Sequence, residues 1–224
     1  VQTLYLWGQG EPFLAPDFLD MVQYAVERGQ RTITSTNGHF LDDAEAIIKS
    51  GLDTLIVSLD GADAETYSAY RVEGNFGKVL NGIRNVSETS HRMGYGPEIV
   101  IQCVINRLNE HDRAGIRRIA REIGMNNVVF KTLQAASMSG GEALVPKEGD
   151  FSRYRRLPDG SLEPDRTGIA RTRCLRLYHS LQIDWMGNVV PCCFDKDSEY
   201  IMGNILNDSF DSIWNGERFR GFRR

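Results

Sequence analysis

Short apolar stretches alternate with amphipathic stretches through the first 133 residues. Runs rich in β-branched or aromatic residues predict five strands, at 4–7, 32–35, 54–59, 99–105 and 127–131. Between them, apolar residues recur at three- to four-residue spacing, which predicts helices over 16–28, 42–51, 76–86 and 116–123. Strands with little polar alternation, separated by amphipathic helices, indicate parallel β-α units with both faces of the sheet covered. The pattern predicts an α/β fold.

Residues typical of helix ends predict where two of these helices begin or stop. Pro16 suits a first helical turn. Asp42 and Glu45 have the spacing of a capping pair, and Gly51 is typical of a helix end. The second helix should therefore begin next to Asp42.

The character of the chain changes after Leu133. Residues 135–170 are rich in Gly and Pro and show no sustained periodicity, which predicts a linker or a loop across the mouth of the sheet. Further on, Leu181, Ile183 and Trp185 alternate with polar residues, Met186-Gly187 can turn, and Val189-Val190 returns. This arrangement predicts a β-hairpin.

Composition excludes several classes of protein. The 224 residues include 26 Lys plus Arg against 30 Asp plus Glu, a net charge of -4, which does not favour non-specific binding to nucleic acid or to an anionic membrane. No apolar run approaches the roughly 20 residues that a membrane span requires, and no leader with a cleavage site opens the chain. A cytoplasmic location is the expectation.

Glycine and polar side chains follow three successive strands. The segments are Gly8-Gln9-Gly10-Glu11-Pro12, Thr36-Asn37-Gly38 and Ser58-Leu59-Asp60-Gly61. Parallel sheets bind ligands at the carboxyl ends of their strands, and glycine lets the backbone approach a ligand closely. Each segment alone is also a good turn. Three of them at equivalent positions favour a ligand site, where exposed carbonyls and a carboxylate would hold an ammonium group.

These three segments, with Tyr67 and Arg71 after the third, resemble the core of the radical S-adenosylmethionine (radical SAM) enzymes, and the likeness covers essentially the whole chain. The resemblance implies that Gly10-Glu11-Pro12, with Gly8 and Gln9, binds the amino group of the cofactor's methionine. Gln9 stands where the family usually has glycine. Asn37 belongs to the same implied site, and Ser58 and Asp60 are implied near the ribose and the substrate.

The C-terminal cysteines carry a second resemblance. Cys174, Gly187 and Cys192 are separated by twelve and four residues, and with 183–193 and 202–214 they resemble SPASM and twitch domains, which hold an auxiliary iron-sulfur cluster. Thiolates are the soft ligands that such clusters require. The resemblance implies Cys174, Cys192 and Cys193 as metal ligands, although a full domain supplies further cysteines downstream and this chain has none after Cys193.

Other roles for the cysteines and histidines remain open from the residues alone. Zinc could be completed by His179 or Asp195, and buried thiols or a disulfide are the non-metal alternatives. Cys103 lies in an apolar run and is expected to be a core residue. His39, His91 and His111 fall in polar stretches and are expected to be solvated.

The family's catalytic cluster motif, Cys-x-x-x-Cys-x-x-Cys, does not occur in this sequence. The chain starts with Val directly before a strand, so we expect a truncation rather than a degenerate relative, and an inactive chain. In the complete enzyme the resemblance implies a 4Fe-4S cluster that cleaves S-adenosylmethionine reductively to a 5′-deoxyadenosyl radical, which abstracts hydrogen from the substrate. The substrate would be a peptide, a protein or a carbohydrate-like small molecule, and flavodoxin or ferredoxin would donate the electron. No catalytic acid or base is identified.

The expected architecture is thus a partial (β/α) barrel of radical SAM type with a small C-terminal α+β module. The barrel would cover 1–133, a linker or capping segment 134–170, and the SPASM- or twitch-like module 171–224. Two other functions stay open. One is a β/α barrel enzyme for a phosphorylated ligand, with Ser139-Gly140-Gly141 as a candidate phosphate loop, and the other is a non-catalytic metal-bearing scaffold.

Overall fold

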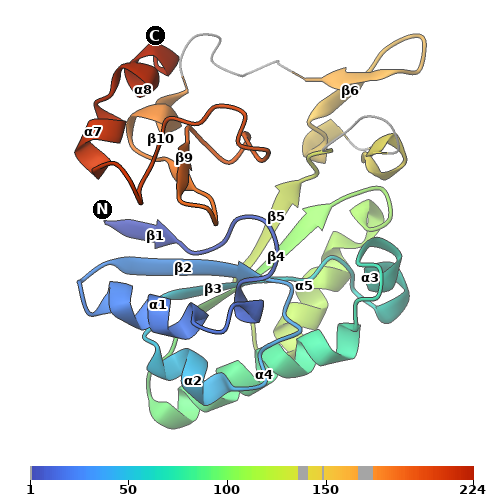
Figure 1. The fold of residues 1–224 in the computed structure, drawn as a ribbon. Coiled ribbons are helices and arrows are strands. Elements are labelled where there is room, and N and C mark those ends of the chain that lie inside the picture. The colour runs from blue at the N-terminus through green and yellow to red at the C-terminus, as the bar shows by residue number, and fades with distance from the viewer. Residues whose placement is uncertain (1, 136–140, 148, 166–173) are drawn as a thin grey trace. The chain divides into compact units, whose positions relative to one another are not determined.

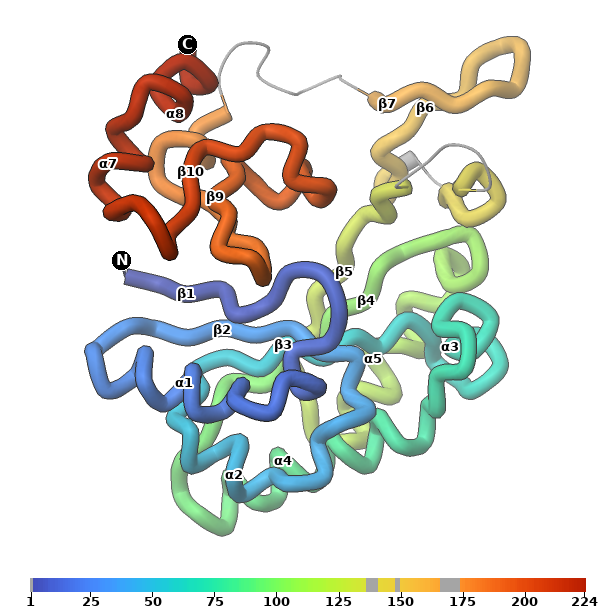
Figure 2. The backbone as a smooth tube through the Cα atoms, in the orientation of Figure 1, coloured from blue at the N-terminus to red at the C-terminus, as the bar shows by residue number. Residues whose placement is uncertain are grey.

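The structure is a computed structural model that describes residues 2–135, 141–147, 149–165 and 174–224. The chain divides into two compact units, Val1–Asp165 and Arg166–Arg224 (Figures 1 and 2). Most of the candidate phosphate loop, and parts of the expected linker 134–170, lie outside the described residues. Of the helices described, none is long and apolar enough to cross a membrane.

The first unit is built on a five-stranded parallel sheet in the order β1-β2-β3-β4-β5. The strands are β1 (Thr3–Tyr5), β2 (Arg31–Thr36), β3 (Thr54–Ser58), β4 (Glu98–Ile105) and β5 (Val128–Thr132). The register places Thr34 beside Leu55, Leu55 beside Ile99, and Ile101 beside Val128. All five predicted strands are confirmed, although β1 covers Thr3–Tyr5 and not the whole run 4–7.

Helices α1 (Phe18–Val26), α2 (Ala44–Lys49), α4 (Phe76–Met93) and α5 (Arg113–Glu122) cover one face of this sheet (Figure 1). The main core lies between them and the strands. It includes Val22, Ile47, Leu55, Val57, Ile83 and Ile101, each at most 1% exposed. Cys103 is fully buried in a second small cluster with Ile105 and Ile116, as predicted for a core residue.

Two helix predictions need correction. Asp43, rather than Asp42, caps α2, because its carboxylate accepts a hydrogen bond of 3.0 Å from the Ala46 amide. Helix α3 (Ala64–Tyr70) was not predicted, since its seven residues show only Tyr67 buried and therefore no apolar periodicity. Its start is nevertheless encoded by Asp63, which accepts from the Thr66 amide at 2.8 Å.

The second unit contains the predicted hairpin. Strands β8 (Gln182–Ile183) and β9 (Asn188–Val190) are antiparallel, and β10 (Gly203–Asn204) adds to β9. The Asp184 carboxylate closes the hairpin turn by accepting from the amides of Met186 and Asn188, each at 2.9 Å. Helices α7 (Phe210–Trp214) and α8 (Glu217–Phe222) complete a small core of Val189, Met202, Ile213 and Phe219.

The remaining described elements are short. They are the 3₁₀ turns η1 (Pro12–Leu14), η2 (Glu110–Asp112), η3 (Glu142–Leu144), η4 (Gly149–Phe151) and η5 (Leu175–Tyr178), and the antiparallel pair β6 (Tyr154–Arg156) and β7 (Leu162–Pro164).

Candidate cofactor site

The loop after β1 presents its backbone to solvent. Gly8, Gln9 and Gly10 are exposed, and Gly10 has φ +90°. A Cβ at Gly10 would meet no atom within 4 Å, so the glycine is required by backbone conformation and not by crowding. An exposed, glycine-shaped loop at the carboxyl end of a parallel strand offers main-chain donors and acceptors to a ligand.

Glu11 joins this loop to the next one. Its Oε1 accepts a hydrogen bond of 2.6 Å from the Thr36 hydroxyl, and its Oε2 accepts one of 2.7 Å from the Asn37 amide. Oε1 also accepts from the Phe13 amide at 3.3 Å and so caps η1, where Pro12 is the first residue. The carboxylate expected to hold an ammonium group is thus engaged by three donors of the protein, which makes it an organiser of the two loops.

The loop after β2 is fixed from both sides. The Asn37 side-chain oxygen accepts from the His39 amide at 2.9 Å and lies 3.1 Å from His39 Nδ1. His39 Nε2 in turn accepts from the Asn75 amide at 2.8 Å, which sets the hydrogen on Nδ1, toward Asn37. The expectation of a solvated His39 is wrong, because its ring links this loop to the N-terminus of α4.

Gly38 has no room for a side chain. Its φ is +81°, and a Cβ there would lie 2.8 Å from Val57 Cγ1 and 2.9 Å from Val79 Cγ1. The loop after β2 therefore packs directly on β3 and α4, and only glycine allows that approach.

Asp60, after β3, faces the interior and is 0% exposed. Its Oδ2 accepts from Arg71 Nε and its Oδ1 from the Val104 amide, both at 2.6 Å. Burial raises the pKa of the Asp60 carboxyl, and the Arg71 guanidinium opposes that shift. Both carboxylate oxygens of Asp60 accept hydrogen bonds from the chain, so neither is presented to a ligand from solvent. Asp60 instead holds β3, β4 and α3 together at the strand ends.

Ser58 lies on the other face of the sheet from the helices. Side chains alternate along a strand, and Leu55 and Val57 belong to the core under the helices, so Ile56 and Ser58 point the opposite way. Ser58 is 8% exposed and is the register partner of Gln102, which shares this face. By the same alternation Ser35 and Lys131 lie there too.

Sequence reasoning missed Ser35, Gln102 and Lys131 because it considered only residues after the strands. A signal was present for Gln102 and Lys131, which are polar residues inside otherwise apolar runs.

The three C-terminal cysteines do not form a metal-binding group. Cys174 and Cys193 are exposed, Cys192 is half-buried, and all are free thiols. Among the described residues no three Cys, His, Asp or Glu side chains gather closely enough to hold a metal ion. Cys192 and Cys193 lie in a tight turn, in which the Asp195 amide donates to the Cys192 carbonyl at 3.1 Å. Asp195, the candidate zinc ligand, instead accepts from the amides of Glu199 and Tyr200, each at 2.9 Å. In the part of the chain that the structure describes, Cys174, Cys192 and Cys193 are therefore not gathered around one metal position.

Two known family models match this sequence. The radical SAM superfamily matches residues 3–118, more than half of the chain. The chain belongs to the radical SAM superfamily. Residues 174–224 match SPASM, an iron-sulfur cluster-binding domain, so S-adenosylmethionine and 4Fe-4S clusters are the cofactors that the two domains imply.

Curated radical SAM relatives match nearly all of the chain at low identity. The chain is 27% identical to the AdoMet-dependent heme synthase of Nitratidesulfovibrio vulgaris over 98% of its own length and 68% of that protein. It is 28% identical to the mycofactocin maturase MftC of Mycobacterium ulcerans over 96% of its length and 63% of that protein. The chain thus spans about two thirds of the length of these radical SAM relatives.

Solved radical SAM structures support the fold. The crystal structure of Streptococcus suis SuiB bound to S-adenosylmethionine matches 99% of this chain and 56% of that chain, with a TM-score of 0.68 and 14% identity. At this identity the likeness concerns the fold alone, and it confirms the radical SAM type of β/α architecture with a C-terminal module.

Proposed function

We propose that this chain binds S-adenosylmethionine at the loops after β1, β2 and β3, as the cofactor-binding part of a radical SAM enzyme. The observation that carries the proposal is the pairing of an exposed glycine loop, Gly8 to Gly10, with a rigid base made by Glu11 and Asn37. A flexible zwitterion is bound best by main-chain groups that are already held in place.

Each residue of the predicted site has a role in this proposal. The backbone of Gly8, Gln9 and Gly10 would bind the amino and carboxylate groups of the methionine part. Glu11, Pro12 and Asn37 would shape and hold that backbone. Ser58 would contact the ligand from the face of the sheet opposite the helices, and Asp60 would keep the β3 loop in position through Arg71.

The chemistry comes from the cofactors. In a complete radical SAM enzyme, reductive cleavage of bound S-adenosylmethionine supplies a 5′-deoxyadenosyl radical for hydrogen abstraction, with the electron from a donor such as flavodoxin or ferredoxin. This chain has no Cys-x-x-x-Cys-x-x-Cys motif, so its own residues do not hold the catalytic cluster. We therefore expect this chain to bind S-adenosylmethionine without cleaving it.

The substrate is proposed by class only. The relatives carry names as different as heme synthase and mycofactocin maturase, which supports a peptide or a small organic molecule. The domain bounds of 1–133, 134–170 and 171–224 remain our proposal for how the chain separates cofactor binding from the SPASM module.

Isothermal titration calorimetry with two ligands tests the proposal. S-adenosylmethionine carries the zwitterion, whereas 5′-methylthioadenosine keeps the nucleoside and lacks it. If the glycine loop binds the zwitterion, S-adenosylmethionine should bind at least tenfold more tightly, about 1.4 kcal/mol. Equal affinities, or thermal stabilisation by sugar phosphates and none by S-adenosylmethionine, would contradict the proposal and favour a phosphate-binding barrel.

A further inference from the structure

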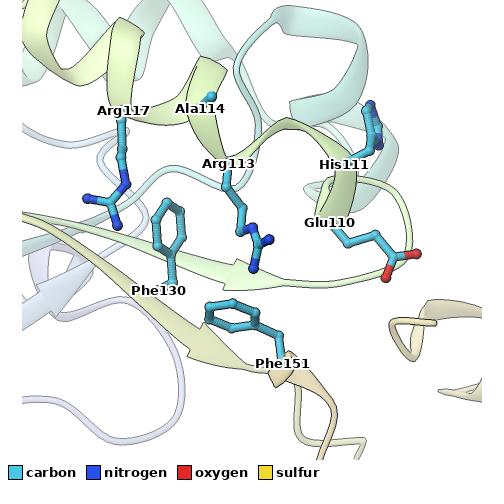
Figure 3. A pocket seen from close by; sticks show the side chains of 7 residues that line it. All are labelled: Glu110, His111, Arg113, Ala114, Arg117, Phe130 and Phe151. Carbon is cyan, nitrogen blue, oxygen red and sulfur yellow. The ribbon is translucent and has the colours of Figure 1, made fainter. Parts of the chain in front are cut away.

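A pocket lies on the helix-covered side of the sheet, between α5, β5 and η4 (Figure 3). Its volume is about 430 Å³, within the range of pockets that take a side chain or a small ligand. Phe130 of β5 and Phe151 of η4 form its apolar wall, with ring centroids 6.2 Å apart in an edge-to-face arrangement. The pocket shares no residue with the proposed cofactor site.

Two arginines of α5 line the same pocket. The Arg113 guanidinium lies 4.7 Å from the centroid of the Phe151 ring, and that of Arg117 lies 4.8 Å from the Phe130 ring (Figure 3). Stacking on the Phe130 face orients the Arg117 guanidinium and leaves N–H donors at its edge. The pocket therefore combines an apolar wall with preoriented cationic groups.

The positive charge continues beyond the pocket. Helix α5 carries four arginines against one glutamate, in a chain of net charge -4. Arg113, Arg117 and Arg121 follow at four-residue spacing and therefore form one ridge, called here the α5 ridge. Arg118 lies off this ridge and pairs with Glu122 at 3.7 Å. Within the described part of the chain, Arg117 and Arg121 have no carboxylate at ion-pairing distance.

The nearby acidic groups are already engaged by the chain. Glu110, at the rim of the pocket, accepts from the Lys147 amide at 2.8 Å and lies 3.9 Å from Arg107 Nε. Asp112 caps α5 by accepting from the Gly115 amide at 2.9 Å. The α5 ridge itself consists of three arginines and contains no acidic residue, so its own charge is positive.

We propose that the α5 ridge and its pocket bind an acidic peptide segment of a protein partner. From Arg113 to Arg121 the ridge is about 12 Å long, which matches about four residues of extended peptide. An aromatic or large aliphatic side chain of that segment enters the pocket and packs against the wall formed by Phe130 and Phe151, and neighbouring Asp or Glu carboxylates pair with the guanidiniums of Arg117 and Arg121. Arginine and aromatic residues are the types that carry most of the binding energy at protein interfaces.

The test uses a phage-displayed library of random dodecapeptides selected on the whole 224-residue chain. Enriched peptides should carry Asp or Glu within four positions of an aromatic or large aliphatic residue. Synthetic copies with a fluorophore then give affinities by anisotropy. We expect Arg117→Ala to weaken binding about tenfold, and Arg118→Ala, a matched loss of one charge on the same helix, less than twofold.

Several results would overturn the proposal. These are enrichment of no sequence, enrichment without acidic bias, or equal weakening by Arg117→Ala and Arg118→Ala, which would indicate non-specific attraction. Phe151→Leu should reduce the preference for an aromatic residue, and an unchanged preference would remove the pocket from the interface. Displacement of the peptide by phenylacetate at comparable affinity would point to a small-molecule pocket instead. All these measurements are made without S-adenosylmethionine, so their outcome does not depend on whether the proposed function is correct.

Discussion

Glu11 and Asn37, which follow two adjacent parallel strands, are joined by a hydrogen bond of 2.7 Å from the Asn37 amide to Glu11 Oε2. With the Thr36 hydroxyl on Oε1 at 2.6 Å, the carboxylate holds the β2 loop against the β1 loop. The position of the exposed glycine loop therefore depends on a side chain that need not touch the ligand.

Replacement of Glu11 should separate this organising role from a direct one. Glu11→Gln keeps the shape of the side chain but places its NH₂ group against the hydrogen-bond donors that the carboxylate accepts from. We therefore expect the affinity for S-adenosylmethionine to fall about tenfold and the free energy of unfolding to fall by about 1–2 kcal/mol. Calorimetry and urea unfolding give the two values. A loss of affinity without any loss of stability would instead assign Glu11 a direct contact with the cofactor.

Gly38 should not tolerate alanine. The new Cβ would meet Val57 and Val79 below 3.0 Å at a φ of +81°, so Gly38→Ala should cost about 2–4 kcal/mol of unfolding free energy. Gly94→Ala is the matched control, because its φ is +77° and a Cβ there meets nothing within 4 Å. It should cost only about 1 kcal/mol. Similar urea midpoints for the two variants would show that the β2 loop does not pack as closely as described.

Replacement of Arg71 should lower the free energy of unfolding, because the buried Asp60 carboxylate would lose its charged partner. Arg71 is about one third exposed and Asp60 is not exposed, so Arg71→Met should destabilise the first unit by about 2–4 kcal/mol. Lys78→Met removes a surface pair with Asp42 at 3.7 Å and should change stability by less than about 0.5 kcal/mol.

The pH dependence of the same variant has a defined sign. Burial raises the pKa of Asp60 above its ordinary 3.8, so the folded chain holds this proton more tightly than the unfolded chain. The contribution of Asp60 to stability is therefore largest below pH 3.8 and is lost as the pH rises through the raised pKa. Without Arg71, which opposes the shift, the loss between pH 4 and 7 should be larger in Arg71→Met than in the parent chain. Parallel urea-midpoint profiles would contradict this.

Iron should bind this chain only weakly. The described residues bring no three potential ligands together, and the SPASM segment offers only Cys174, Cys192 and Cys193 as thiols. After anaerobic reconstitution with iron and sulfide, we expect much less than one 4Fe-4S cluster per chain, and its removal by a mild chelator. Absorption should fall further in Cys174→Ser and Cys192→Ser than in Cys193→Ser. A stoichiometric, chelator-resistant cluster would show that the cysteine loops rearrange around the metal.

The sequence predicts the sheet well because its strands are buried on the helix side and carry little polar alternation. Helix α3 was missed since its identity rests on the Asp63 cap and one buried tyrosine, which periodicity does not detect. The candidate site was predicted as a set of loops, and their adjacency follows from parallel pairing. The role of each residue within the site was not predicted. Whether the carboxylates of Glu11 and Asp60 face solvent or the protein depends in part on distant donors: Thr36 is 25 positions from Glu11, and Val104 is 44 positions from Asp60.

The consecutive strand order has a consequence for how the molecule is made. β1 pairs with β2, β2 with β3, β3 with β4, and β4 with β5, so no strand is inserted between two that were synthesised earlier. Each newly synthesised strand can pair with the edge strand of the sheet that has already formed. The helix that follows it can then cover the new strand pair. Folding can therefore advance in step with translation, with little time during which an unpaired central strand is open to aggregation.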